Sequence, residues 1–344
     1  MQLSERIDAL VRWGAALEVL VGSGEQEWST ENHPLGPEVI RARQENPWFT
    51  FGSIEQALFG ILPWLDRMAL TTWAGNYPGL TQSTSGKSVG LILAGNIPLV
   101  GFHDVLTVLL SGHSALIKLS SDDRVLLPFL LKILFELEPR FSDSVRIVHK
   151  LENPDAVIAT GSNNSARYFE YYFGKYPHII RRNRTSVAVL TGEETDEDLR
   201  GLCSDIYSYF GLGCRNVSKL YVPVGYDFDR FFKVMENYGF LMQHNKYMNN
   251  YDYHRALYLL NKEPFLTNNF LLLREHPELS TPVSVLHFER YSSKTELDSE
   301  LKRLENGIQC VVGTGFLPFG SAQCPGPMDY SDGVDTMRFL IGLH

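Results

Sequence analysis

The chain has 344 residues, of which 44% are hydrophobic and 12% aromatic, and its formal net charge is −9. This length allows two domains of ordinary size, and the composition excludes a disordered or low-complexity protein. The net negative charge argues against general binding to nucleic acid or to an anionic membrane, because both need many lysines and arginines to neutralise phosphate.

Residues 1 to 80 are predicted to be largely helical and to wrap a sheet that begins later in the chain. The first twenty residues carry Glu5, Asp8 and Glu18 among apolar residues at helical spacing, which is typical of an amphipathic surface helix rather than a signal peptide. The most apolar region, residues 89 to 119, is interrupted by polar residues and a proline, so it is unsuited to span a bilayer. We therefore expect a cytoplasmic protein without an integral membrane segment.

Strands and helices are predicted to alternate from residue 88 onward. The predicted strands cover residues 88–94, 114–119, 145–148 and 156–160, with residues 185–190 closing the series. The helices between them are predicted to end at about residues 110, 137 and 173. Strands that alternate with helices at this spacing predict a parallel α/β sheet covered on both faces. Ligands of such sheets bind at the carboxyl ends of the strands.

A second, smaller α/β series is predicted after this one. Its elements are a helix from the charged segment 192–200 to about residue 210, a strand at 218–223, a helix at 228–243, a strand at 282–288, a helix at 294–304 and a strand at 309–312. We therefore expect a first domain of residues 1–190, completed by residues 321–344, and a second domain of residues 191–320.

The four cysteines, Cys203, Cys214, Cys310 and Cys324, have neither the paired spacing of a zinc site nor the density of a disulfide framework. We expect no metal and a reducing compartment. Cys214 lies in the segment Gly-Leu-Gly-Cys-Arg-Asn (211–216), where the glycines let a substrate approach the sulfur and the arginine favours a thiolate. A nucleophile and a buried loop cysteine both fit this pattern. Cys203 and Cys310 are expected in the core, and the role of Cys324 stays undecided.

Polar residues follow three of the predicted strands. Asn96 follows the first, where its amide suits either an oxyanion site or the geometry of a turn. Lys118, followed by Ser120 and Ser121, suits either ribose and phosphate oxygens or a solvated strand end. Gly161-Ser162 precedes a helix, which suits either a pyrophosphate or a turn without a ligand. Neither of the common glycine-rich nucleotide-binding motifs is present.

Five segments in a shared order resemble segments of one enzyme superfamily. They are Asn-Ile-Pro-Leu at 96–99, Gly-His-Ser-Ala-Leu-Ile-Lys-Leu-Ser-Ser at 112–121, Thr-Gly-Ser at 160–162, Glu-Leu-Ser-Thr-Pro-Val at 278–283 and Pro-Phe-Gly at 318–320. With Cys214 at the position of the nucleophile, they resemble the aldehyde dehydrogenase superfamily. The resemblance runs from about Gly90 onward and is closest to the acyl-CoA reductase branch, the fatty-acid reductase type of bacterial luminescence.

The resemblance implies a role for each candidate residue. Cys214 would be the nucleophile and Asn96 part of the oxyanion hole. Lys118 and Ser121 would face the adenosine ribose of the cofactor. The turn Gly161-Ser162 would receive the pyrophosphate, and Glu278 would contact the nicotinamide ribose. Lys219, five residues after Cys214, stands where the family usually has an arginine. The first domain would then bind a nicotinamide cofactor, and the second would carry the catalytic cysteine.

Two departures from the family pattern are informative, one about the reaction and one about the cofactor. Hydrolytic members carry a glutamate that activates water, but the comparable segment here, residues 181–186 (Arg-Arg-Asn-Arg-Thr-Ser), has no carboxylate. A thioester on Cys214 would therefore survive long enough to be reduced. Ser121 replaces a glutamate that would repel a 2′-phosphate, so NADPH (NADP) is permitted, and NADH (NAD) is also compatible. We expect reduction of an acyl-CoA, with a fatty acyl chain favoured, to the aldehyde.

Several alternatives remain open at this stage. One is a CoA-acylating aldehyde dehydrogenase or an acyl-phosphate reductase on the same fold, and another is a non-catalytic nucleotide-binding protein. His103, His244 and His287 are candidate proton donors, and each also suits a structural role. A homo-oligomer and an acyl-transfer partner protein are both compatible with the sequence.

Overall fold

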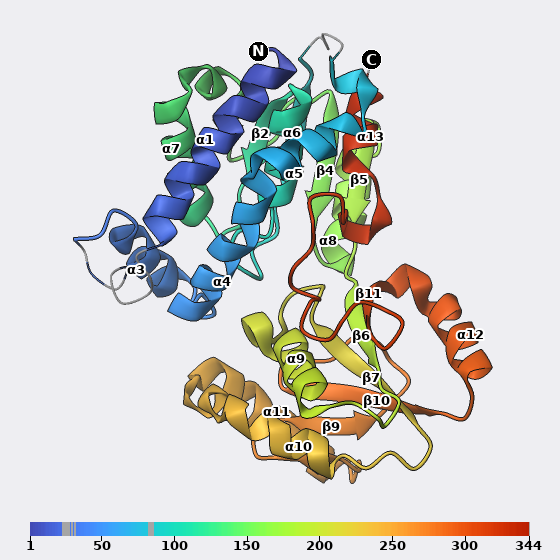
Figure 1. Cartoon of the computed structure of the whole chain (residues 1–344). Coiled ribbons are helices and arrows are strands. Elements are labelled where there is room, and N and C mark those ends of the chain that lie inside the picture. Colours follow the sequence, from blue (N-terminus) through green and yellow to red (C-terminus); the bar gives the residue numbers. More distant parts are fainter. Residues whose placement is uncertain (23–27, 29, 31, 82–85, 344) are drawn as a thin grey trace. The chain divides into compact units, whose positions relative to one another are not determined.

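The computed structural model describes residues 1–22, 28, 30, 32–81 and 86–343. The chain forms two compact units (Figure 1), one of residues Met1–Arg182 with Gly326–His344 and the other of residues Asn183–Pro325. The chain therefore returns to the first unit after it has formed the second.

The sheet of the first unit is parallel throughout. Its strands are β1 (Ser88–Ile92), β2 (Ser114–Lys118), β3 (Val145–Ile147), β4 (Ala156–Thr160) and β5 (His178–Arg181), in the order β3-β2-β1-β4-β5. The chain moves outward from β1 through β2 to β3 and then crosses to β4 and β5 on the other side. The order of the strands thus reverses between β1 and β4, and ligands of open α/β sheets bind at such a reversal, outside the carboxyl ends of the strands.

Helices cover this sheet, as predicted for residues 1–80 and for the alternating series. The α-helices are α1 (Leu3–Val21), α3 (Gly36–Glu45), α4 (Phe51–Ile61), α5 (Arg67–Gly75), α6 (Phe102–Ser111), α7 (Leu126–Leu137), α8 (Asn163–Phe173) and α13 (Thr336–Ile341). The short 3-10 helices are η1 (Leu62–Leu65), η2 (Pro78–Thr81), η3 (Pro139–Asp143) and η7 (Ser331–Gly333). Helix α1 forms because its buried residues, such as Ile7, Leu10 and Leu17, recur at helical spacing.

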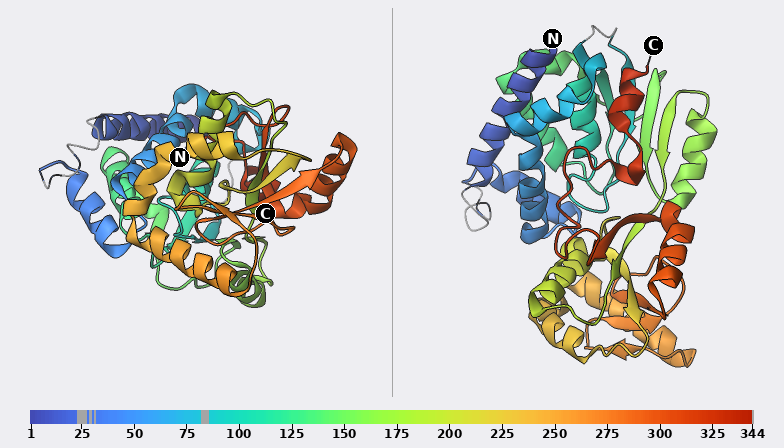
Figure 2. Two further views of the ribbon diagram at one scale, coloured as in Figure 1. Left: turned by 90° about the horizontal axis from the view of Figure 1, so that it is seen from below. Right: turned by 45° about the vertical axis from the view of Figure 1, so that its right-hand side comes forward.

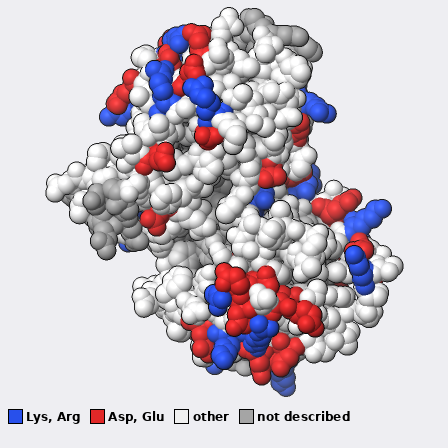
Figure 3. Space-filling model, viewed as in Figure 1, with Lys and Arg blue, Asp and Glu red and all other residues white. Residues whose placement is uncertain are grey.

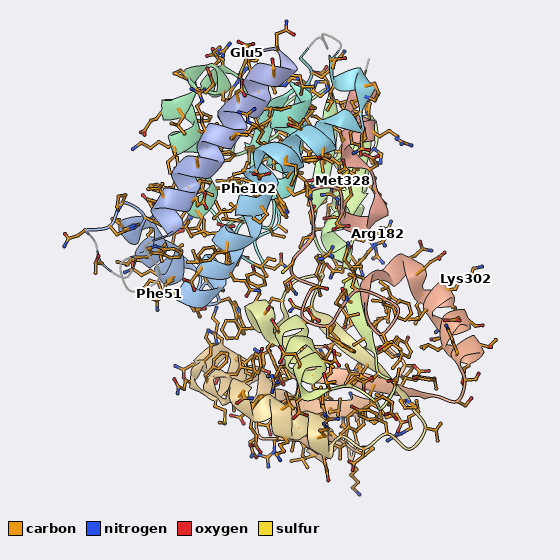
Figure 4. The ribbon with its side chains drawn as sticks, viewed as in Figure 1. Glu5, Phe51, Phe102, Arg182, Lys302 and Met328 are labelled. Carbon is orange, nitrogen blue, oxygen red and sulfur yellow. The ribbon has the colours of Figure 1, made fainter. Side chains whose placement is uncertain are left out.

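Aromatic packing fixes α1 against the rest of its unit. The ring of Trp13 on α1 lies 5.2 Å from the ring of Phe102 on α6, centroid to centroid, and its Nε1–H donates to the Leu130 carbonyl of α7 at 2.9 Å. Phe102 is labelled in Figure 4 among the helices of this unit. Both views that show the helix from the side place α1 beside α7 (Figures 1 and 2). A buried tryptophan with its N–H satisfied contributes strongly to such a core.

The second unit contains a six-stranded mixed sheet. Its strands are β6 (Thr185–Val189), β7 (Val217–Pro223), β8 (Leu266–Thr267), β9 (Leu272–Glu275), β10 (Val285–Tyr291) and β11 (Ile308–Gly313), in the order β11-β6-β7-β10-β9-β8. Only the pair β8–β9 is antiparallel. The helices are α9 (Asp196–Tyr207), α10 (Asp229–Met235), α11 (Asn245–Leu260) and α12 (Lys294–Leu304), with 3-10 helices η4 (Ser208–Gly211), η5 (Glu236–Gln243) and η6 (Glu305–Gly307).

The strand predicted to close the first series was assigned to the wrong sheet. β6 (Thr185–Val189) pairs with β7 and β11 of the second unit, and the first sheet ends instead at β5, which was not predicted. A five-residue apolar run has the same appearance in either sheet, because strand pairing and not local sequence decides which sheet it joins. The predicted boundary at residue 190 therefore lies inside the second unit.

Charges of both signs are mixed over the surface. Figure 3 shows acidic and basic side chains side by side on the visible face of the second unit. In that unit Arg200 pairs with Glu197 at 2.9 Å and Arg230 with Asp196 at 2.7 Å. In the described parts of the chain, no helix is long and apolar enough to cross a membrane.

Candidate active site

The carboxyl edge of the first sheet gathers the residues proposed for that unit. In register, Ile92 at the end of β1 pairs with Lys118 at the end of β2 and with Ala159 near the end of β4. Because the strands are parallel, the loops that follow them leave from the same edge. The structure therefore brings the predicted residues after β1, β2 and β4 to one edge of one unit, at the reversal of strand order. These residues are Asn96, Lys118, Ser120, Ser121, Gly161 and Ser162.

The loop that carries Asn96 is held in a specific conformation. The Asn96 side chain is exposed, whereas Gly95 before it is buried. A Cβ atom on Gly95 would lie 2.6 Å from the Oγ of Ser120, so only glycine lets this loop pass so close to the loop after β2. Leu99 has a φ of 57°, a left-handed conformation that a leucine adopts only when its surroundings impose it.

A buried carboxylate that the sequence analysis missed supports this strained residue. Asp123 is 8% exposed, and its Oδ2 accepts the backbone N–H of Leu99 at 2.8 Å. Burial raises the pKa of Asp123 to about 6, and the hydrogen bond from Leu99 opposes that rise. Asp123 thus fastens the loop that carries Asn96, although the two residues come from different β–α connections.

The residues after β2 form a tight polar turn. Lys118 is half-buried, and Ser121 is exposed. The Oγ of Ser120 accepts the Asp122 N–H at 3.2 Å, and the Asp122 carbonyl accepts the Asn46 side-chain amide at 3.2 Å. Ser120 therefore shapes the turn that follows β2.

The turn after β4 is built for close approach. Ser162 is the N-cap of α8, and its Oγ accepts the Ser165 N–H at 3.1 Å. A Cβ atom on Gly161 would lie 2.9 Å from both Ser165 and the ring of Phe169, so a larger residue would push the turn away from the helix. The remaining N–H groups of the first turn of α8 and the helix dipole favour an anion there.

Cys214 lies in the second unit, on the loop between η4 and β7. It is half-buried. Its carbonyl accepts the Ser186 hydroxyl at 3.1 Å, and the Cys310 sulfur lies 3.0 Å from the same hydroxyl oxygen. Just before the loop, Tyr209 and Phe210 have φ values of 51° and 59°, so the backbone that leads to the cysteine is strained.

Asn216 joins the cysteine loop to the end of α9. This residue is 1% exposed, and its Oδ1 accepts the Gly213 N–H at 2.8 Å. Its Nδ2 lies within hydrogen-bonding distance of the carbonyls of Asp205, Ile206 and Ser208, the last at 2.7 Å. One buried amide therefore fixes the backbone on both sides of the strained turn.

Arg215 and Asp205 fasten a second loop to the cysteine region. Arg215 donates its Nε–H to the Ala322 carbonyl at 2.5 Å. The Asp205 carboxylate accepts the N–H groups of Gly320 and Ala322 at 2.7 and 2.9 Å. Burial raises the pKa of Asp205 to about 6, against the effect of these hydrogen bonds and of Arg215. The Pro-Phe-Gly segment at 318–320 is thereby held beside the helix that precedes Cys214.

The other cysteines differ in burial, and none of the four forms a disulfide. Cys203 is fully buried, as predicted, and burial raises the pKa of its thiol to about 12. Cys310 is only partly buried, short of the core position predicted for it, and Cys324 is exposed. A thiol with a pKa near 12 is inert at neutral pH, so Cys203 is unsuited to nucleophilic chemistry.

Each histidine considered as a proton donor has a structural partner. His103 is stacked on Trp73 with ring centroids 5.4 Å apart, its Nε2 lies 2.8 Å from the Pro327 carbonyl, and burial lowers its pKa. His244 caps α11 by accepting the Tyr247 N–H at 3.2 Å. His287 is buried with its Nδ1 2.9 Å from the Glu278 carbonyl. Glu278 itself is exposed on the loop between β9 and β10.

Solved structures with the same architecture are aldehyde dehydrogenases and related enzymes. An NADP-dependent enzyme from E. coli matches with a TM-score of 0.61 and 13% identity over 91% of this chain and 73% of its own. An aldehyde dehydrogenase from Bacillus cereus, in an E194S mutant form, gives 0.63 and 13% over 91% and 72%. Betaine aldehyde dehydrogenase from Staphylococcus aureus, in complex with NAD⁺, gives 0.62 and 9% over 90% and 76%. Identities this low show the fold alone.

The comparison of sequences is more specific. No curated protein sequence matches the chain. The model of the family described as acyl-CoA reductase (LuxC) matches residues 54–229, more than half of the chain and a stretch that includes both Asn96 and Cys214. With an aldehyde dehydrogenase-like fold as well, the chain is an oxidoreductase, and it belongs to the acyl-CoA reductase (LuxC) family.

Proposed function

We propose that this enzyme reduces a fatty acyl-CoA to the aldehyde with NADPH, and that Cys214 carries the acyl group between the two halves of the reaction. The observation that supports this most is the construction of the Cys214 loop. A half-buried cysteine sits on a strained backbone that Asn216 and Ser186 fix from both sides. Such rigidity suits a nucleophile, whose sulfur must be held at one position, and a merely space-filling cysteine does not need it.

The acyl transfer follows from the chain's own groups. The Cys214 thiolate attacks the acyl carbon, the bond from that carbon to the CoA sulfur breaks, and CoA leaves as its thiolate. The backbone N–H of Cys214 is our proposed donor to the oxyanion that forms on the way. No carboxylate lies in residues 181–186 to activate water, so the thioester persists until it is reduced.

The residues present fit a nicotinamide dinucleotide. Gly161 and the first turn of α8 leave room and N–H groups for a pyrophosphate, and Lys118, Ser120 and Ser121 supply polar atoms for the adenosine ribose. Glu278 offers an exposed carboxylate to the nicotinamide ribose. When bound, the cofactor supplies the hydride that reduces the acyl group. We favour NADP over NAD because the exposed Ser121 adds no negative charge beside a 2′-phosphate.

The proposal is tested by product analysis. Purified enzyme with NADPH and acyl-CoAs of increasing chain length is expected to release aldehyde and one equivalent of free CoA per NADPH consumed. Cys214→Ala should abolish both products, whereas Cys324→Ala, at an exposed position, should leave them unchanged. Aldehyde formed at the same rate by Cys214→Ala would refute the assignment. Turnover of acyl phosphates but not acyl-CoAs would refute the substrate.

We propose that the protein is located in the cytoplasm, because its four cysteines form no disulfide and that compartment keeps thiols reduced. The acyl-CoA is the substrate partner. We also propose a homo-oligomer, which sedimentation would test. We propose an acyl-transfer protein as a partner, which transfer of its acyl group to Cys214 would test.

A further inference from the structure

The loop that carries Glu278 is held by hydrogen bonds to its backbone. Its consecutive carbonyls at Pro277, Glu278 and Leu279 each accept from a side chain of the sheet below. The donors are the Nζ of Lys219 at 2.7 Å, the Nδ1 of His287 at 2.9 Å and the Oγ of Ser218 at 2.6 Å, in that order. Three consecutive carbonyls that each accept from a side chain of the sheet fix the backbone of this loop.

Lys219 is the most costly of these donors. It is 0% exposed, and its Nζ also contacts the Glu289 carboxylate at 2.6 Å. Burying a lysine carries a large desolvation cost, and an apolar side chain of the same volume would usually be at least as stable in its place. The charge is therefore better explained by the geometry that it imposes on Pro277 than by the stability that it adds.

The two imidazoles near Glu278 have defined proton positions. A carbonyl only accepts, so the proton of His287 is on Nδ1. His276, whose ring centroid is 4.6 Å from that of His287, accepts the Glu278 N–H at its Nδ1 at 3.3 Å, so its own proton is on Nε2. Burial lowers the pKa of His287 to about 4, which keeps the ring neutral at neutral pH. Both backbone groups of Glu278 are thus satisfied by side chains.

The side chain of Glu278 contrasts with its backbone. It is exposed, and across the described residues it forms no ion pair or hydrogen bond. The loop is therefore fixed in place while the carboxylate is left for a ligand.

The strand β7 connects this loop to the nucleophile. It begins at Val217, three residues after Cys214, and it supplies both Ser218 and Lys219. His287 on β10 occupies the register position directly opposite Lys219. The same strand therefore sets the position of the Cys214 loop at its start and of the Glu278 loop through its side chains.

We infer that Lys219, His287 and Ser218 are positioning residues that hold Glu278 at the point where it binds the ribose of the nicotinamide cofactor. This inference rests on the proposed role of Glu278. If it holds, the buried Lys219 contributes to the affinity for the cofactor and not to the acylation of Cys214.

The test separates these two steps. NADPH affinity is measured by fluorescence titration of the full-length enzyme, and acylation of Cys214 by the mass of the protein after mixing with acyl-CoA without cofactor. Glu278→Ala is expected to weaken NADPH binding roughly tenfold, the loss of one charged hydrogen bond. Lys219→Met should weaken it by a similar factor, with acylation within about twofold of wild type. Lys233→Met, at an exposed lysine on α10, is the matched control and should change neither.

The decisive comparison is the double variant. If Lys219 acts through Glu278, then Lys219→Met should weaken binding no further once Glu278→Ala is present. Additive losses would overturn the inference while leaving the cofactor role of Glu278 intact. No loss in Glu278→Ala alone would overturn that role, and the inference with it. If Lys219→Met fails to fold, Ser218→Ala, which removes one hydroxyl, serves in its place with an expected loss of about threefold.

Discussion

Single residues set the shape of the Asn96 loop in the first unit and of the Cys214 loop in the second. In the first unit, Asp123 accepts the N–H of Leu99, a residue with a left-handed backbone, and so fixes the loop of Asn96. In the second, Asn216 does the same for the loop of Cys214. Each is a buried polar side chain whose hydrogen-bond partners are backbone groups. Such hydrogen bonds fix the backbone of the loop directly.

The buried carboxylate of Asp123 has a predictable effect on stability. Its pKa of about 6 in the folded protein lies above the ordinary 3.8, so folding disfavours the ionised form. The associated stability is present below pH 3.8 and is lost as the pH rises through about 6. Asp123→Asn keeps the acceptor and removes the charge. Between pH 4 and 7 the variant should gain about 3 kcal/mol relative to wild type in urea unfolding. A constant difference across that range would contradict a raised pKa.

Thiol reactivity provides a second test of burial. Cys203, with a pKa of about 12, should remain unmodified in the native protein after iodoacetamide treatment, while exposed Cys324 is alkylated. Peptide mass mapping checks this order, and rapid labelling of Cys203 would show that α9 is not packed as described.

At the level of elements, the conformation of the segment between α9 and β7 depends on the side chain of Asn216. Asn216→Ala removes the hydrogen bond that the Gly213 N–H donates and the buried hydrogen bonds to the Asp205 and Ile206 carbonyls. We expect a loss of about 2–3 kcal/mol in the free energy of unfolding and a slower acylation of Cys214. Asn250→Ala, at a less buried position on α11, is the control and should cost under about 0.5 kcal/mol. Equal losses in the two variants would contradict the role of Asn216.

Local patterns predicted most elements, and their limits have physical reasons. Helix α12 (Lys294–Leu304) has the predicted bounds because its leucines recur at helical spacing. Strand β4 (Ala156–Thr160) has them because it is a short, continuous apolar run followed by a turn. Helix α11 was missed because it buries only three tyrosines among polar residues. The helix predicted at 228–243 is instead α10 followed by the 3-10 helix η5, which contains Gly239.

The same limit applies to the site. Residues next to a turn or a glycine, such as Asn96, Gly161 and Cys214, have local signals. Asp123 and Lys219 were not recognised as supports, because their partners Leu99 and Pro277 are 24 and 58 residues away in the chain. Contacts of that kind are decided by the fold, so no pattern of neighbouring residues reports them.

At the scale of the whole molecule, specific hydrogen bonds attach the last segment of the chain to the first unit. Trp73 donates its Nε1–H to the Tyr330 hydroxyl at 2.7 Å, and Tyr330 and Tyr77 share a hydrogen bond of 2.9 Å. His113 contacts the Leu340 carbonyl at 3.0 Å, and Arg181 donates to Thr336 at 2.9 Å. Hydrogen bonds along the segment from Tyr330 to Leu340 therefore attach it to the first unit, and Met337 and Leu340 are buried there.

Tyr330→Phe tests this attachment. The loss of two partly buried hydrogen bonds should destabilise the first unit by about 1–3 kcal/mol. Amide hydrogen exchange should become faster in α5 and α13 and stay unchanged in residues 183–325, because the units have separate cores. Tyr171→Phe, at a tyrosine that is 83% exposed, is the control. Faster exchange throughout the chain would contradict this separation.

The central claim is that Cys214 carries the acyl group. The most direct measurement is the intact mass of the enzyme after mixing with a fatty acyl-CoA, before and after NADPH is added. We predict a mass increase of one acyl group, mapped to Cys214, absent from Cys214→Ala and lost on addition of NADPH as aldehyde appears. An acyl group that still attaches to Cys214→Ala, or that NADPH leaves in place on the wild-type enzyme, would contradict the account.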